Sequence, residues 1–145
     1  MVDTQVGDAA EQGLRQYVRE VADAIGIGPG GTWCEVDGDA TAYVALDRRP
    51  VSCPRCDAAL VWDEVHGWAL AIETGAGENL VVFDYCDGGL MPAPETVAEF
   101  TEGALAARYP RSRTPHPTAH DRETLYAKLA RYARRRAGVH HDYGG

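Results

Sequence analysis

Residues 60–74 read LVWDEVHGWALAIET and contain the clearest strand pattern of this 145-residue chain. Trp68, Leu70 and Ile72 alternate with other residues, and a period of two is typical of a strand with one buried face. Turn-forming residues interrupt the apolar pattern between Asp63 and Gly67. The stretch therefore predicts a hairpin of two strands, at residues 60–62 and 68–74.

The same patterns continue on both sides of this hairpin. Further strands are predicted at residues 33–36, 40–46 and 80–85. Helices are predicted at residues 9–25 and 95–108, where apolar residues recur at three- and four-residue steps. Short turns between consecutive strands favour an antiparallel meander with helices covering one face. The expected fold class is α+β: a meander of about five strands with flanking N- and C-terminal helices, plus a basic C-terminal helix.

The domain boundary is expected near Tyr109-Pro110. The division places an α+β domain at residues 9–109, a proline-containing linker at 110–120, a basic helix at 121–137 and a frayed tail at 138–145. The two ends of the chain differ in charge: residues 1–110 sum to −13 and residues 111–145 to +5, for a net charge of −8. Such charge segregation is typical of a tail that binds something anionic.

Two interpretations of the basic helix remain open. Arg131, Arg134 and Arg135 are candidate binding residues that could contact phosphates, which would make the protein a nucleic-acid binder. Alternatively, a narrow stripe of Leu125, Leu129 and Tyr132 docks the helix on the acidic domain or on an acidic surface of a partner. Docking is favoured, because a domain with a charge of −13 repels nucleic acid.

The cysteines are the most suggestive residues for chemistry. Cys53 and Cys56 form one C-x-x-C pair, the spacing of half a zinc site, and Cys34 and Cys86 are candidates for the remaining ligands. A redox-active pair is a second interpretation, although such motifs usually begin a helix. The third and favoured interpretation is reduced thiols in a surface loop, with small buried residues at Cys34 and Cys86.

The turn of the 60–74 hairpin combines two carboxylates with an imidazole, in Asp63, Glu64 and His66. An acid–base pair needs such groups in a cleft, whereas a hairpin turn is more often solvated. Trp62 and Trp68 flank the turn, and packing across the strands is favoured over ligand stacking. The chain lacks the common phosphate-binding, hydrolase and metalloprotease motifs, so no catalytic residue is assigned and an enzyme is not expected.

No apolar run of about 18 residues exists, and the N-terminus lacks the basic and apolar parts of a secretory signal. A cytoplasmic protein without membrane contact is therefore expected. A single lysine stands against 13 arginines, a bias typical of a GC-rich genome.

Three segments, at residues 13–19, 40–47 and 60–74, together resemble a family of small actinobacterial proteins known as domain of unknown function 6292. The resemblance covers roughly residues 13–106 and is most specific around Trp62 and Trp68. It implies an actinobacterial source and a helix-flanked sheet, and it transfers no catalytic residues because none are assigned in that family. The loop from Cys53 to Cys56 departs from the family pattern.

The leading functional hypothesis is a non-enzymatic, adaptor-like binding or regulatory module that holds a protein partner. Its candidate binding residues on the sheet are Trp62, Trp68 and His66. Two alternatives remain: a small zinc-stabilised module built on the loop from Cys53 to Cys56, and a nucleic-acid binder that uses the basic tail.

Overall fold

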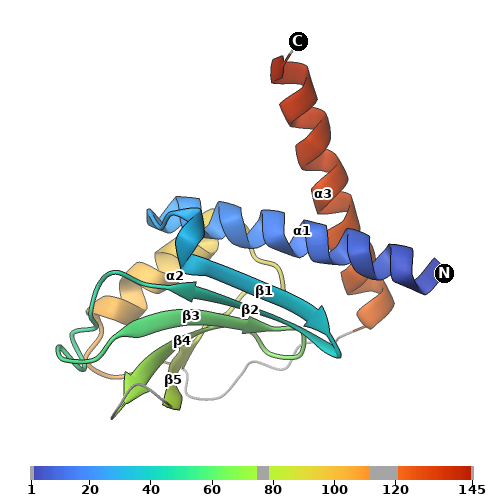
Figure 1. The fold of residues 1–145 in the computed structure, drawn as a ribbon. Coiled ribbons are helices and arrows are strands. Elements are labelled where there is room, and N and C mark those ends of the chain that lie inside the picture. The colour runs from blue at the N-terminus through green and yellow to red at the C-terminus, as the bar shows by residue number, and fades with distance from the viewer. Residues whose placement is uncertain (1, 75–78, 112–120, 145) are drawn as a thin grey trace.

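The computed structural model describes residues 2–74, 79–111 and 121–144, and their side chains from 8 onward and up to 133 (Figure 1). The strands form one antiparallel sheet in the order β1-β2-β3-β4-β5. They are β1 (Thr32–Asp37), β2 (Asp39–Ala45), β3 (Ala58–Asp63), β4 (Gly67–Thr74) and β5 (Asn79–Tyr85). The predicted α+β meander is therefore confirmed.

The helices are α1 (Val2–Ile25), α2 (Pro94–Ala106) and α3 (Arg122–Gly144), with a short 3₁₀ turn η1 (Pro29–Gly31) before the sheet. Helix α1 begins seven residues before the predicted start at residue 9, and α3 continues through the region expected to fray. Extending an existing helix is far easier than nucleating one, which explains why both helices run past their apolar stripes. None of the helices in the described ranges is both long and apolar enough to span a membrane.

The hairpin turns follow from local backbone preferences. Gly38 and Gly67 have φ of +79° and +75°, which only glycine adopts readily. Asp63 Oδ1 accepts hydrogen bonds from the backbone N–H groups of Val65 and His66, at 2.8 and 2.7 Å. This turn sets the register that pairs Trp62 directly with Trp68 across β3 and β4.

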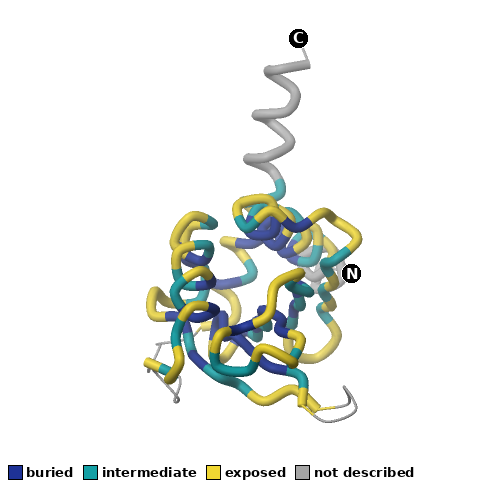
Figure 2. Tube along the Cα trace, turned by 90° about the vertical axis from the view of Figure 1, so that its left-hand side faces the viewer, coloured by how far each residue is buried: buried dark blue, intermediate teal, exposed yellow. Residues whose placement is uncertain are grey.

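The core lies between the sheet and the helices that cover one of its faces (Figures 1 and 2). Helix α1 contributes its predicted apolar stripe, and β3 and β4 contribute the larger side chains of the sheet. The main members of this buried cluster are Leu14, Tyr17, Val18, Val21, Leu60, Trp62, Trp68 and Leu70. Both tryptophans are at most 2% exposed, so the packing interpretation is confirmed and their rings are not available on the surface.

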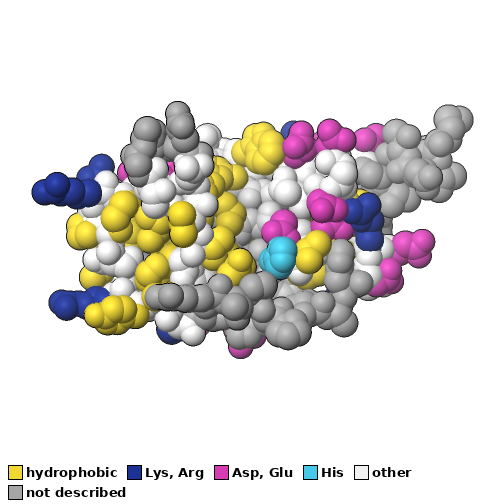
Figure 3. Space-filling view, turned by 90° about the horizontal axis from the view of Figure 1, so that it is seen from below, with side chains coloured by type: hydrophobic (Ala, Val, Ile, Leu, Met, Phe, Trp, Pro, Cys, Tyr) yellow, Lys and Arg dark blue, Asp and Glu magenta, His cyan; other side chains and the backbone are white. Residues whose placement is uncertain are grey.

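On β4 the opposite face of the sheet carries Ala69 and Ala71, which alternate with the core residue Leu70. Figure 3 shows this side of the molecule, with hydrophobic side chains gathered toward one end and acidic side chains toward the other. The acidic end holds the turn at Asp63, and the apolar end holds the start of β5.

Helix α3 is docked on the domain through the apolar stripe predicted for it. Leu125 and Leu129 are buried in the same cluster as α1. The helices cross so closely that a Cβ on Gly13 would lie 1.6 Å from the carbonyl oxygen of Leu129. The absence of a side chain at Gly13 is therefore what allows α1 and α3 to approach.

Candidate binding cleft

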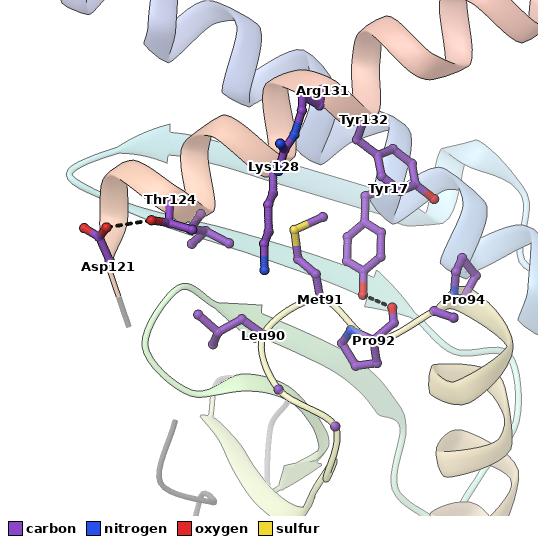
Figure 4. Close-up of a pocket in the computed structure, with 14 residues that line it drawn as sticks. Tyr17, Leu90, Met91, Pro92, Pro94, Asp121, Thr124, Lys128, Arg131 and Tyr132 are labelled. Atoms are coloured by element: carbon purple, nitrogen blue, oxygen red, sulfur yellow. Dashed lines mark hydrogen bonds between the residues drawn. The ribbon is translucent and has the colours of Figure 1, made fainter. Parts of the chain in front are cut away.

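A cleft of about 1120 Å³ opens where α3 passes the segment between β5 and α2 (Figure 4). One side, the floor of the cleft, is formed by residues 88–94, which include Leu90, Met91 and Pro92. Two hydrogen bonds from the core hold this floor: Trp62 Nε1 donates to Leu90 O at 2.7 Å, and Tyr17 Oη donates to Pro92 O at 2.5 Å. The floor is thus held in place before any ligand arrives.

Tyr17 connects the tryptophan hairpin to the cleft. Its hydroxyl accepts a hydrogen bond from Trp68 Nε1 at 3.1 Å while donating to Pro92 O. Burial raises the pKa of Tyr17, so the phenol stays protonated and remains a donor. The ring also packs edge-on against Tyr132 of α3, with 5.5 Å between centroids. Trp62 and Trp68 are therefore positioning residues for the cleft rather than surface contacts.

The other side of the cleft is formed by α3. Asp121 immediately precedes the helix, and its oxygens accept hydrogen bonds from Leu125 N at 3.0 Å and from the hydroxyl of Thr124 at 2.6 Å. Lys128 and Arg131 follow on the side of α3 that faces the cleft, and Figure 4 shows the lysine chain reaching down toward Leu90 and Met91. Lys128 lies one helical turn before Tyr132, whose hydroxyl donates to Glu20 at 2.8 Å.

The two cations of the cleft differ from most of the other arginines whose side chains the structure describes. Within residues 8–74, 79–111 and 121–133, no carboxylate pairs with either Lys128 or Arg131, although both are exposed. The arginines that do have carboxylate partners are Arg15, Arg48, Arg49, Arg111 and Arg122. The cleft therefore combines an apolar floor with cations that are free to pair with an incoming anion.

A buried carboxylate anchors the start of α3. Glu64 is fully buried and accepts hydrogen bonds from Ala40 N at 2.7 Å, Arg122 Nε at 2.9 Å and Tyr126 Oη at 3.1 Å. Burial works to raise the pKa of Glu64, but these hydrogen bonds outweigh it and hold the pKa below its ordinary value. The same arginine also reaches Asp39 at 2.8 Å. The predicted docking on the acidic domain thus includes a specific ionic contact.

The amino-acid sequence of the chain matches one known family. The model for a family of unknown function, DUF6292, matches residues 17–103, more than half of the chain. The chain belongs to this family. No curated protein and no solved structure matches it. The DUF6292 region includes Tyr17, the tryptophan hairpin and the floor of the cleft, whereas Lys128 and Arg131 lie beyond it.

The structure keeps two of the three residues of the β3–β4 turn of this DUF6292 domain together and separates the third. His66 Nδ1 lies 3.1 Å from Asp63 Oδ1 at the surface of the turn, with its ring 6.5 Å from that of Tyr85. Glu64, between them in sequence, is buried against Arg122. The three side chains therefore do not form one cluster, because adjacent residues in a turn can point into different environments. None of the three lines the cleft.

The cysteines of the DUF6292 protein match the favoured expectation only in part. Cys53 and Cys56 are joined as a disulfide, so the prediction of reduced thiols in this loop is wrong. Cys34 and Cys86 are free thiols elsewhere in the sheet, the first half-buried and the second buried. Among the described residues, no three His, Cys, Asp or Glu side chains gather as a metal site would require. The four candidate zinc ligands are not brought together.

Of the remaining candidate residues, Arg131 lies in the cleft. Arg134 and Arg135 belong to α3, but their side chains lie outside the described part of the chain. Sequence reasoning missed Tyr17, Lys128 and the floor segment. The available signal was Gly88-Gly89 followed by Leu90-Met91-Pro92, an apolar run in a connection where polar residues are usual.

Proposed function

We propose that this DUF6292 protein is a non-enzymatic, adaptor-like binding module, and that the cleft between α3 and residues 88–94 holds a segment of a partner protein. The observation that carries the proposal is the pairing of an apolar floor with Lys128 and Arg131, two cations without a carboxylate partner among the described residues. Binding sites generally combine an apolar surface with a few well-placed polar groups.

The chemistry of the cleft favours a segment that carries both apolar and acidic side chains. An apolar side chain would cover Leu90 and Met91, which are half-buried in the free protein. A neighbouring carboxylate would then pair with Lys128 or Arg131. The cleft volume of about 1120 Å³ exceeds that of most small-molecule sites, roughly 300–1,000 Å³, and suits a short peptide.

A protein partner is favoured over nucleic acid for an electrostatic reason. The chain carries a net charge of −8, and the first 110 residues account for −13. Nucleic-acid binding draws most of its affinity from neutralising several phosphates at once, whereas the described lining of the cleft offers two cations. A peptide with one or two carboxylates needs no more than this. A cytoplasmic setting and an actinobacterial origin remain predictions within this proposal.

The test is selection of peptides from a random library on the immobilised full-length chain. We expect enriched sequences that combine acidic and large apolar residues. The double variant Lys128→Glu with Arg131→Glu should lose at least about tenfold in affinity for them, or roughly 1.4 kcal/mol. Arg19→Glu, the same kind of charge reversal at one exposed position of α1, serves as the control and should bind normally.

Two results would contradict the proposal. One is enrichment of peptides without acidic residues whose affinity is unchanged by the double variant. The other is tight binding of single-stranded DNA that weakens steeply with added salt and competes with the peptides, since this would identify the cations as phosphate contacts.

A further inference from the structure

The loop between β2 and β3, residues 46–57, is attached to the domain by contacts that do not involve its cysteines. Val51 N donates to Leu105 O of α2 at 2.8 Å, and Asp57 O accepts from Glu73 N at 2.9 Å. Arg48 also makes a bidentate ion pair with Glu102 of α2, in which Arg48 Nη1 donates to Glu102 Oε1 at 2.8 Å. These contacts would hold the loop in place whether or not its cysteines are bonded.

The disulfide between Cys53 and Cys56 sits at the tip of this loop. It closes a ring of only four residues, and such a short link restricts the unfolded chain less than a long one does. Both cysteines are partly exposed, and Pro54 and Arg55 between them are exposed. A bond that adds little to the fold and lies at the surface is suited to being opened and closed.

We propose that Cys53 and Cys56 form a thiol–disulfide exchange site whose substrates are thiols. In the forward direction the thiolate of a substrate attacks one sulfur of the pair, forming a mixed disulfide and releasing the other cysteine as a thiolate that takes up a proton. A second substrate thiolate then attacks the substrate sulfur of the mixed disulfide, which forms the substrate disulfide and releases the remaining protein cysteine as a thiolate that takes up a proton. In sum, two substrate thiols are oxidised to one disulfide, and the protein disulfide gains two electrons and two protons.

The surroundings of the pair support this assignment. Arg55 lies between the two cysteines in sequence and is exposed, whereas Arg49 of the same loop pairs with Asp57 at 3.6 Å. A positive charge close to a cysteine favours the thiolate, which is the reactive form, and Arg55 is the residue of the loop placed to supply it. The loop contrasts with Cys34 and Cys86, since burial raises the pKa of both thiols and brings that of Cys86 to about 11. The chain thus contains one partly exposed bonded pair, one half-buried thiol at Cys34 and one buried thiol at Cys86.

Two exposed apolar side chains of β5 lie at the same end of the sheet as the loop. The register aligns Ala58, Ile72 and Val81 in one row across β3, β4 and β5, directly after Cys56 and Asp57. Ala58 and Ile72 are buried, whereas Leu80 and Val81, which point to opposite faces of β5, are 44% and 53% exposed. Figure 3 shows hydrophobic side chains gathered at this end of the molecule, with arginine or lysine side chains at the rim. This surface suits a thiol carried by a polypeptide as well as a small free thiol.

The experiment equilibrates the folded, full-length chain in glutathione buffers of increasing reducing power, traps free thiols by alkylation and locates the label by mass spectrometry. We expect Cys53 and Cys56 to change state together and reversibly, with circular dichroism unchanged. Labelling of the reduced pair should be at least about tenfold faster than that of Cys34 and Cys86. The variants Cys53→Ser and Cys56→Ser should each block the paired change, and one of them should trap a mixed disulfide with glutathione.

A second arm replaces glutathione by a peptide with one cysteine between leucines. Leu80→Ser with Val81→Ser should slow exchange with this peptide and leave exchange with glutathione unchanged if polypeptide thiols are the substrate. If the native chain and this double variant exchange with the peptide at the same rate, the substrates of the site are small thiols. The proposal is overturned if the pair opens only when the protein unfolds, if it stays reduced in every buffer, or if Cys34 and Cys86 exchange equally fast. Cys86→Ser is the matched control and should exchange as the native chain does.

Discussion

The substitution Gly13→Ala tests whether the docking of α3 is held by the close crossing of two helices. A Cβ at this position would lie 1.6 Å from Leu129 O and 2.4 Å from Leu129 C, whereas real Cβ atoms essentially never approach closer than 3.0 Å. The atoms in the way belong to the backbone, so no rotation of a side chain relieves the clash. Helix α3 must move away from α1.

The cost of that movement can be estimated from what α3 buries. Leu125 and Leu129 are 4% and 0% exposed, and full burial of a leucine contributes about 1.5–3 kcal/mol. Alanine gains about 1 kcal/mol over glycine as a helix former, which opposes the loss. We therefore expect the free energy of unfolding to fall by about 2–5 kcal/mol.

Gly103→Ala in α2 is the matched control, since it makes the same change inside another helix. There the new Cβ would meet only the far end of Arg111, 3.0 Å away, which can swing aside. This variant should gain up to about 1 kcal/mol. Urea denaturation followed by circular dichroism measures both variants, and trypsin should cleave α3 faster in Gly13→Ala alone. Equal gains in stability for the two variants would refute the close crossing.

Three further predictions concern the contacts that position the cleft. Glu64→Gln should lower the free energy of unfolding by about 1.5–3 kcal/mol because a charged partner of Arg122 is lost, whereas Glu102→Gln, in an exposed ion pair, should cost about 1 kcal/mol or less in the same urea titration. Because the folded-state pKa of Glu64 is below its ordinary value of 4.5, the stability that its charge contributes should be complete above pH 4.5 and be lost as the pH falls through the folded pKa. The free energies of unfolding of the native chain and of Glu64→Gln, measured by urea titration, should therefore converge in acid. A difference between them that stays constant down to low pH would contradict this. Tyr17→Phe removes the hydroxyl that bonds Pro92 O and should cost about 1–3 kcal/mol and weaken binding of selected peptides; unchanged peptide affinity would show that the floor does not depend on it.

Much of the architecture follows from the sequence because its signals are local. The alternation in residues 60–74 and the glycine at 67 predict a hairpin without reference to any other part of the chain. The pairing of Trp62 with Trp68 follows from that register, and the stripe of Leu125 and Leu129 predicts a docked helix. In each case the physical cause operates over a few neighbouring residues.

The cleft and the anchoring of α3 were decided by tertiary structure. Tyr17 and Pro92 are separated by 75 residues, and Glu64 and Arg122 by 58, so no local pattern connects them. The opposite fates of Asp63 and Glu64 show the same point, since two adjacent carboxylates differ only in what the rest of the fold brings to them. Gly13 looks like any helical glycine until Leu129 is placed against it. The sequence by itself determined the elements and their apolar faces, because backbone preference and periodicity act locally. The packing of those faces determined the site, because burial and hydrogen bonding depend on residues far away along the chain.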